Sequence, residues 1–63
     1  MKLLRYFNYN HLPDELQKIS KPFQDLALDI ATKLPESTET EMALRKLLEA
    51  KDCAVRAALD NIE

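Results

Sequence analysis

Apolar residues recur at helical spacing along the C-terminal part of the chain. They advance in alternating steps of three and four, which indicates one face of an α-helix. This seam consists of Leu44, Leu48, Lys51, Val55, Ala58 and Ile62, and a second line widens it: Leu47, Ala50, Ala54 and Ala57. Thr38 and Glu41 have the spacing of a capping box, which satisfies free N–H groups at a helix start. The pattern predicts a long helix over 39–61, with the cation of Lys51 as an oddity in its seam.

An earlier apolar stripe predicts a first helix over 14–33. Its members are Leu16, Ile19, Phe23, Leu26 and Ile30. Pro13 suits the first position of this helix, where a missing N–H is no loss. Pro22 interrupts the stripe, and an interior proline removes one hydrogen bond and clashes with the preceding turn. We therefore expect a helix that is kinked at Pro22 or broken into 14–20 and 21–33, with Ser20 capping the second piece.

The segments outside the two helices complete the expected fold. Residues 34–37 form a connection so short that the helices must be antiparallel neighbours. Residues 1–12 hold both tyrosines and one of the two phenylalanines without helical periodicity, which favours an arm or loop over the alternative of an isolated strand. This arm can dock on its own hairpin or on a neighbouring subunit. The sequence predicts an all-α fold, one domain over 1–63, built as an antiparallel helical hairpin with an N-terminal arm.

The small size of the chain predicts self-association. A chain of 63 residues is a marginal length for a single hydrophobic core. Cys53 is the one cysteine, so no intramolecular disulfide can form, and no Cys/His cluster suggests a structural metal. Oligomerisation is the remaining source of stability. We expect a homo-oligomer whose apolar faces are shared between chains.

The charge balance limits the classes of partner. Charged residues make up 32% of the chain and the net charge is −2, whereas a binder of long nucleic acid normally carries a basic stripe. A small anionic ligand needs only two or three cations. The chain shows neither a signal peptide nor a membrane-spanning length of apolar residues, and its lone thiol is typical of a reducing compartment. These features predict a cytoplasmic protein that binds neither DNA nor membranes.

The sequence offers no catalytic set. His11 is the one histidine and has no nucleophile or second metal ligand suggested beside it, so a loop or capping role is expected. Cys53 lies between the two apolar lines of the long helix, which favours packing over reactivity. No carboxylate pair stands out as general acid and base. We therefore expect no enzyme activity, no cofactor and no metal.

Aromatic rings and cations are the groups that remain for ligand binding. Tyrosine rings stack on bases, and lysine or arginine neutralises phosphate, so Tyr6, Tyr9 and Lys21 could together bind a nucleotide. On chemistry alone, the sequence favours the simpler interpretation, in which both tyrosines pack the arm and Lys21 is a solvated surface charge. Lys51 and Arg56 lie in or beside the seam of an oligomerising helix, where a buried cation needs a partner.

These residues occur in short motifs that resemble those of the phage-encoded small helical sponges that counter CBASS immunity. This family shares a hairpin domain with a Thoeris anti-defence protein. The matching segments are YNHL at 9–12, ISK at 19–21, LLEAK at 47–51 and VRAA at 55–58. The resemblance implies a helical hairpin with an N-terminal arm that assembles as a homohexamer in the host bacterial cytoplasm. It also implies sequestration of cyclic oligonucleotide second messengers without cleavage, which starves the defence effector.

The resemblance also implies roles for individual residues. Tyr9 matches the tyrosine that stacks on a base of a cyclic dinucleotide, and Tyr6 is the alternative stacking residue. Lys21 matches the lysine that pairs with phosphate. Arg56 matches an arginine that lines a separate cyclic trinucleotide pocket, with Leu59 or Ala58 nearby.

Two other functional interpretations compete with the sponge. A helical protein–protein interaction or assembly module, with no small ligand, explains the composition equally well. A DNA-binding helix-turn-helix is weaker, because the chain is acidic and has no basic recognition helix.

Overall fold

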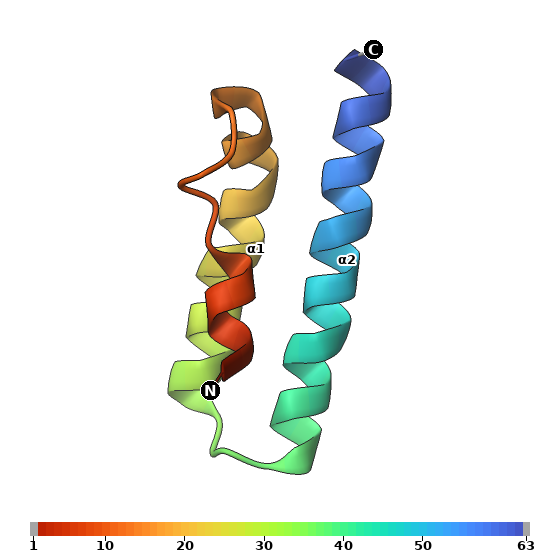
Figure 1. The fold of residues 1–63 in the computed structure, drawn as a ribbon. Helices are drawn as coiled ribbons and strands as arrows, with labels where there is room; N and C mark the ends of the chain where they lie inside the picture. Colours follow the sequence, from red (N-terminus) through yellow and green to blue (C-terminus); the bar gives the residue numbers. More distant parts are fainter. Residues whose placement is uncertain (1, 63) are drawn as a thin grey trace.

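The protein is an antiparallel pair of helices with a short helical arm packed against it (Figure 1). The structure, a computed structural model, describes residues 2–62, with side chains through residue 60. A 3-10 helix η1 (Lys2–Phe7) leads into α1 (Asp14–Lys33), and the connection at 34–37 leads into α2 (Thr38–Ile62). No strand occurs within residues 2–62. The predicted all-α class and the hairpin are confirmed.

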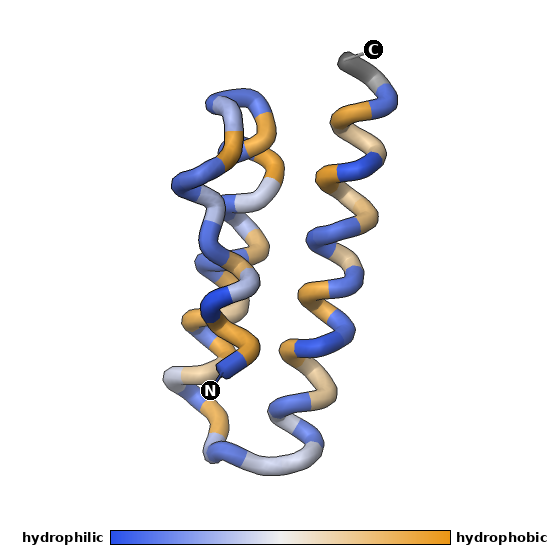
Figure 2. Tube along the Cα trace, viewed as in Figure 1, coloured by the Kyte–Doolittle hydropathy of each residue, from blue (hydrophilic) through white to orange (hydrophobic). Residues whose placement is uncertain are grey.

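All three elements meet in one small core. Phe7 of η1, Ala27 of α1 and Leu44 of α2 are fully buried and form a single cluster. Partly buried side chains surround it: Leu3, Leu4, Phe23, Ile30, Leu47 and Leu48. Figure 2 shows hydrophobic positions alternating with hydrophilic ones along both long helices. The core therefore lies in the half of the hairpin nearer the connection, where η1 covers it.

The arm is helical and docks on its own chain. The prediction of a non-helical arm is wrong, as is the alternative of an isolated strand, because residues 2–7 form η1. Phe7 supplies the reason, since its ring is completely buried against both long helices. The arm continues through a turn in which the Leu12 N–H donates to the Tyr9 carbonyl at 3.0 Å.

Helix α1 runs unbroken through Pro22. The expected division into 14–20 and 21–33 is wrong, because one helix spans Asp14–Lys33 with Pro22 inside it. Proline removes the N–H that would donate to the Lys18 carbonyl, but packing of the helix against η1 and α2 holds the remaining turns together. Ser20 is buried in this helix rather than capping a second one, and its Oγ has no hydrogen-bond partner among the described residues.

The buried face of α1 is shifted from the predicted stripe. Leu16 is buried as expected, but Ser20 and Ala27 are the other fully packed positions. Ile19 and Leu26, which belong to the stripe, remain exposed. The other two members of the stripe, Phe23 and Ile30, pack partly buried against the core.

Ser37 caps the second helix. Its Oγ accepts a hydrogen bond from the Thr40 N–H at 3.2 Å, and its carbonyl accepts the first helical bond, from the Glu41 N–H at 2.9 Å. The predicted capping box of Thr38 and Glu41 is therefore wrong by one residue. The helix spans Thr38–Ile62, against the expected 39–61. The side chain of Ile62 lies outside the described residues.

Lys51 has a partner within its own helix. Its side chain is only 13% exposed, which agrees with a position in the seam, and its Nζ lies 3.1 Å from Oδ1 of Asp52. Asp52 reaches the solvent, so the ammonium can extend along apolar surface towards it. No helix in the part that the structure describes has the length and hydropathy of a membrane span.

Candidate functional site: an aromatic and basic groove beside the arm

The structure brings Tyr9 and Lys21 together in one open groove. This groove encloses about 480 Å³ and is lined by five residues: Tyr9, Asp14, Gln17, Lys18 and Lys21. Tyr9 comes from the segment that joins η1 to α1, and the others come from the first two turns of α1. One aromatic residue and two lysines thus line the same surface, which is open to solvent.

The geometry of α1 explains why these side chains gather. Positions 14, 17, 18 and 21 are separated by three or four residues, so they share one face of the helix. The segment that carries Tyr9 is fastened to this face, because Nε2 of Gln17 donates a hydrogen bond of 2.7 Å to the Leu12 carbonyl. The first helical bonds, from the N–H groups of Leu16 and Gln17 to the Pro13 carbonyl, complete the corner.

Lys21 is held by a carboxylate of its own helix. Its Nζ donates to Oδ2 of Asp25 at 2.9 Å, and both side chains are exposed. The hydrogen bond and charge of Asp25 raise the pKa of Lys21 above its ordinary value of 10.5, and Tyr9 acts in the same direction. Because the folded-state pKa is raised, the stabilising effect is present below pH 10.5 and is lost as the pH rises through the shifted pKa.

Replacing Asp25 with asparagine is expected to move the pKa of Lys21 down towards that of a free lysine. The variant removes the negative charge and the ionic acceptor while keeping the size of the side chain. Titration of the lysine side chains by NMR measures this change. Asp29→Asn is the matched control, because Asp29 pairs with Lys33 at 3.0 Å and not with Lys21. A Lys21 titration that is identical in both variants would contradict the assigned ion pair.

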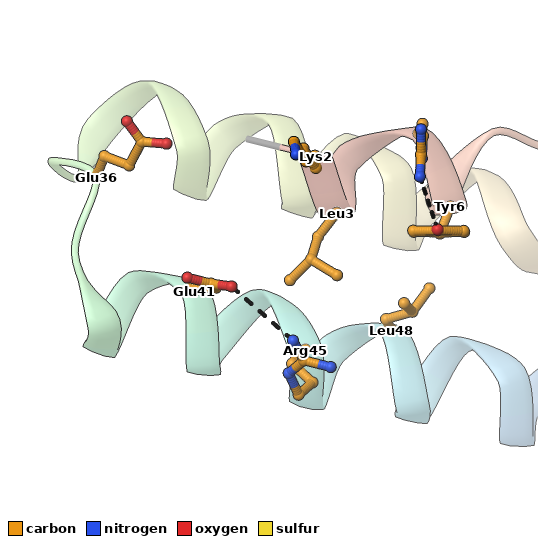
Figure 3. A pocket seen from close by; sticks show the side chains of 8 residues that line it. Lys2, Leu3, Tyr6, Glu36, Glu41, Arg45 and Leu48 are labelled. Atoms are coloured by element: carbon orange, nitrogen blue, oxygen red, sulfur yellow. Dashed lines mark hydrogen bonds and ion pairs between the residues drawn. The ribbon is translucent and has the colours of Figure 1, made fainter.

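Tyr6 lies in a different groove, between η1 and the first turns of α2 (Figure 3). This groove is about 660 Å³ in volume and is lined by Lys2, Leu3, Arg5, Tyr6, Glu36, Glu41, Arg45 and Leu48. Arg5 covers the Tyr6 ring at 5.0 Å from its centre and donates to the Tyr6 hydroxyl at 3.0 Å. One face of the ring is therefore occupied, and Tyr6 does not share a groove with Lys21.

Arg56 and Leu59 are separate from both grooves. Arg56 is exposed on α2, and its Nη2 lies 3.3 Å from Sγ of Cys53. Leu59 is exposed one turn further on, while Ala58 is partly buried. Cys53 is itself exposed, so the prediction of a core role for this thiol is wrong. It lies on the side of α2 away from the seam.

Sequence reasoning missed three residues of the Tyr9–Lys21 groove. Lys18 adds a second cation, and Asp14 and Gln17 add oxygen and amide groups. Their helical spacing from Lys21 was a signal that could have found them. His11 lies in the turn between the arm and α1 and is exposed, as the predicted loop role requires.

No protein-family model, no curated protein and no solved structure matches this chain.

Proposed function

We propose that this protein binds cyclic dinucleotides and sequesters them without cleavage, and so antagonises CBASS antiphage signalling in the bacterial cytoplasm. The single observation that carries the proposal is the shared groove of Tyr9 and Lys21. These two residues were selected from the sequence by their chemistry and by the resemblance to the sponge family. Tyr9 and Lys21 lie close together because the segment between η1 and α1 folds back against α1.

The groove has the parts that a nucleotide requires. The Tyr9 ring offers a stacking surface for a base, and Lys18 and Lys21 offer two positive charges for phosphate oxygens. To bind phosphate, the ammonium of Lys21 must turn from Asp25 or share its three donors between the two partners. The Lys21 ammonium thereby exchanges the Asp25 carboxylate for a phosphate of the ligand, and no covalent bond of the ligand is broken. Sequestration thus follows from binding alone.

A calorimetric titration with a panel of cyclic dinucleotides and trinucleotides tests the proposed function. We expect saturable binding of at least one cyclic dinucleotide. Chromatography of the recovered ligand is expected to return it intact. Absence of binding to every member of the panel would refute the sponge function, and a degraded ligand would refute sequestration without catalysis.

A second binding region for cyclic trinucleotides is proposed around Arg56, with Leu59 beside it. The guanidinium is exposed on α2, and the thiol of Cys53 is a weak acceptor that it can readily leave. Copies of Arg56 around a symmetry axis would concentrate positive charge. This region therefore depends on assembly of several chains.

We further propose a homohexamer, as the resemblance implies. The accessible surface of one chain is 4617 Å², whereas about 4200 Å² is usual for a folded monomer of its mass. Apolar positions of the two predicted stripes remain uncovered within the chain, among them Ile19, Leu26, Ala50 and Ala57. Shared burial of these positions would supply the apolar contact area that the small core lacks.

Replacing Leu26 with aspartate is expected to dissociate the assembly. Leu26 continues the apolar stripe of α1 and is 48% exposed, so a charge there would have to be buried in a contact between chains. Leu28→Asp is the matched control: Leu28 is 47% exposed but lies nearly opposite on the helix. Light scattering after chromatography measures the mass. A wild-type protein that is already monomeric, or equal effects of both changes, would contradict the proposed interface.

The alternative of a helical assembly module is favoured by the same exposed apolar residues, since it needs no ligand. A protein that binds no cyclic nucleotide but gains helical order with a partner protein would establish it.

A further inference from the structure

We infer that the Tyr9–Lys21 groove selects guanine over adenine, with the carboxylate of Asp14 reading the edge of the base. The inference rests on the proposed function and specifies which cyclic dinucleotide the groove takes. Polar atoms line the groove beside the two lysines.

Asp14 supplies the group in this lining that can only accept. Asp14 presents a carboxylate, which accepts hydrogen bonds only, and it takes part in no ion pair within residues 2–60. Gln17 has both an NH₂ and an oxygen, but its Nε2 already donates to the Leu12 carbonyl at 2.7 Å. Its oxygen is left as an acceptor, and its second N–H is left as a donor. The Tyr9 hydroxyl lies in the plane of its ring, so it does not point at a base stacked on that ring.

The two carboxylate oxygens of Asp14 fit guanine better than any other base. The Watson–Crick edge of guanine carries two adjacent donors, N1–H and N2–H₂, which can bind both oxygens of one carboxylate. Adenine has a single donor there, beside an acceptor nitrogen that would face the carboxylate and be repelled. A two-point contact of this kind typically discriminates between bases by roughly tenfold to a hundredfold.

The order of side chains along α1 suits a nucleotide in one orientation. Asp14 lies in the first turn, and Lys21 lies about 10 Å further along the axis, at 1.5 Å per residue. Lys18 lies between them. A base stacked on Tyr9 can therefore point its edge towards Asp14 while its phosphate points towards the lysines. The reverse orientation would set phosphate against the carboxylate.

Calorimetric titration with cyclic di-GMP and cyclic di-AMP tests this assignment. The wild-type protein is expected to bind cyclic di-GMP at least tenfold more tightly. In Asp14→Asn one acceptor oxygen becomes a donor, and this ratio is expected to fall to near one. The ratio is the readout, because removing a negative charge can strengthen binding of either anion. Glu15→Gln is the matched control, since Glu15 is a first-turn carboxylate that does not line the groove, and the ratio is expected to persist.

The possible outcomes distinguish loss of guanine selection from loss of cyclic dinucleotide binding. Equal affinities in the wild-type protein, a preference for cyclic di-AMP, or an unchanged ratio in Asp14→Asn would overturn guanine selection while leaving cyclic dinucleotide binding intact. Binding of neither ligand, nor of any other cyclic dinucleotide, would overturn the proposed function and guanine selection with it. Circular dichroism of each variant checks that the helices are retained.

Discussion

Replacing Lys21 with alanine is expected to lower the affinity for a cyclic dinucleotide by roughly tenfold to a hundredfold. A hydrogen bond between an ammonium and a phosphate oxygen is charge-assisted, and its loss leaves the phosphate facing the carboxylate of Asp25. The substitution should leave folding almost unchanged, because Lys21 is exposed and its ion pair is a surface contact. Calorimetry with the tightest cyclic dinucleotide of the panel provides the measurement.

Tyr9 and Arg56 give this expectation its controls. Tyr9→Ala should weaken dinucleotide binding by about 1–3 kcal/mol per stacked base, whereas Tyr9→Phe should retain most of the affinity because the ring remains. Arg56→Ala should spare dinucleotides and weaken trinucleotides, since Arg56 lines neither groove. If Lys21→Ala and Arg56→Ala weakened both ligand classes equally, the two-site proposal would fail.

Replacing Phe7 with alanine is expected to destabilise the protein by about 3–5 kcal/mol, the usual cost of removing a buried phenylalanine ring. Phe7 is completely buried and joins η1 to both long helices. A single core in a domain of this size rarely supplies more than about 3–5 kcal/mol, so most of the variant should be unfolded. Urea unfolding followed by circular dichroism measures the loss.

Tyr6 is the matched control for this experiment. It is the preceding residue of the same helix and is 50% exposed, so Tyr6→Ala should cost far less than Phe7→Ala. Phe7→Leu, which keeps an apolar side chain in place, should fall between them. Equal stability of the Phe7→Ala and Tyr6→Ala variants would show that the arm does not contribute to the core.

The helix boundaries could be read from the sequence because they depend on local chemistry. The prolines at 13 and 35 and the polar cluster at 36–38 delimit two apolar periodic segments, and the helices Asp14–Lys33 and Thr38–Ile62 agree closely with the expected 14–33 and 39–61. The short connection required an antiparallel hairpin. The predicted cap, Thr38, was one residue too late. Ser37 is the cap, and sequence alone does not distinguish them, because either hydroxyl can accept from an N–H two or three residues ahead.

The errors occurred where packing between elements overrides local preference. Of the two alternatives predicted at Pro22, a kink or a break, the break is wrong, because packing against η1 and α2 holds α1 as one helix. The arm lacks a periodic pattern, yet burial of the single ring of Phe7 orders it as η1. Ser20 and Ala27 are buried in α1, whereas Ile19 and Leu26 of the predicted stripe stay exposed.

For the candidate site, residue chemistry alone indicates which side chains suit an anionic aromatic ligand. Tyrosine and lysine are recognisable by their chemistry, and Tyr9 and Lys21 were selected on that basis together with the family resemblance. Folding places both residues in the lining of one groove, adds Lys18 and Asp14 to it, and leaves Tyr6 and Arg56 elsewhere. The physical reason is the corner between η1 and α1. The path of this segment depends on burial of Phe7 and on the hydrogen bond from Gln17 to the Leu12 carbonyl. Both contacts join parts of the chain that the local sequence pattern does not relate.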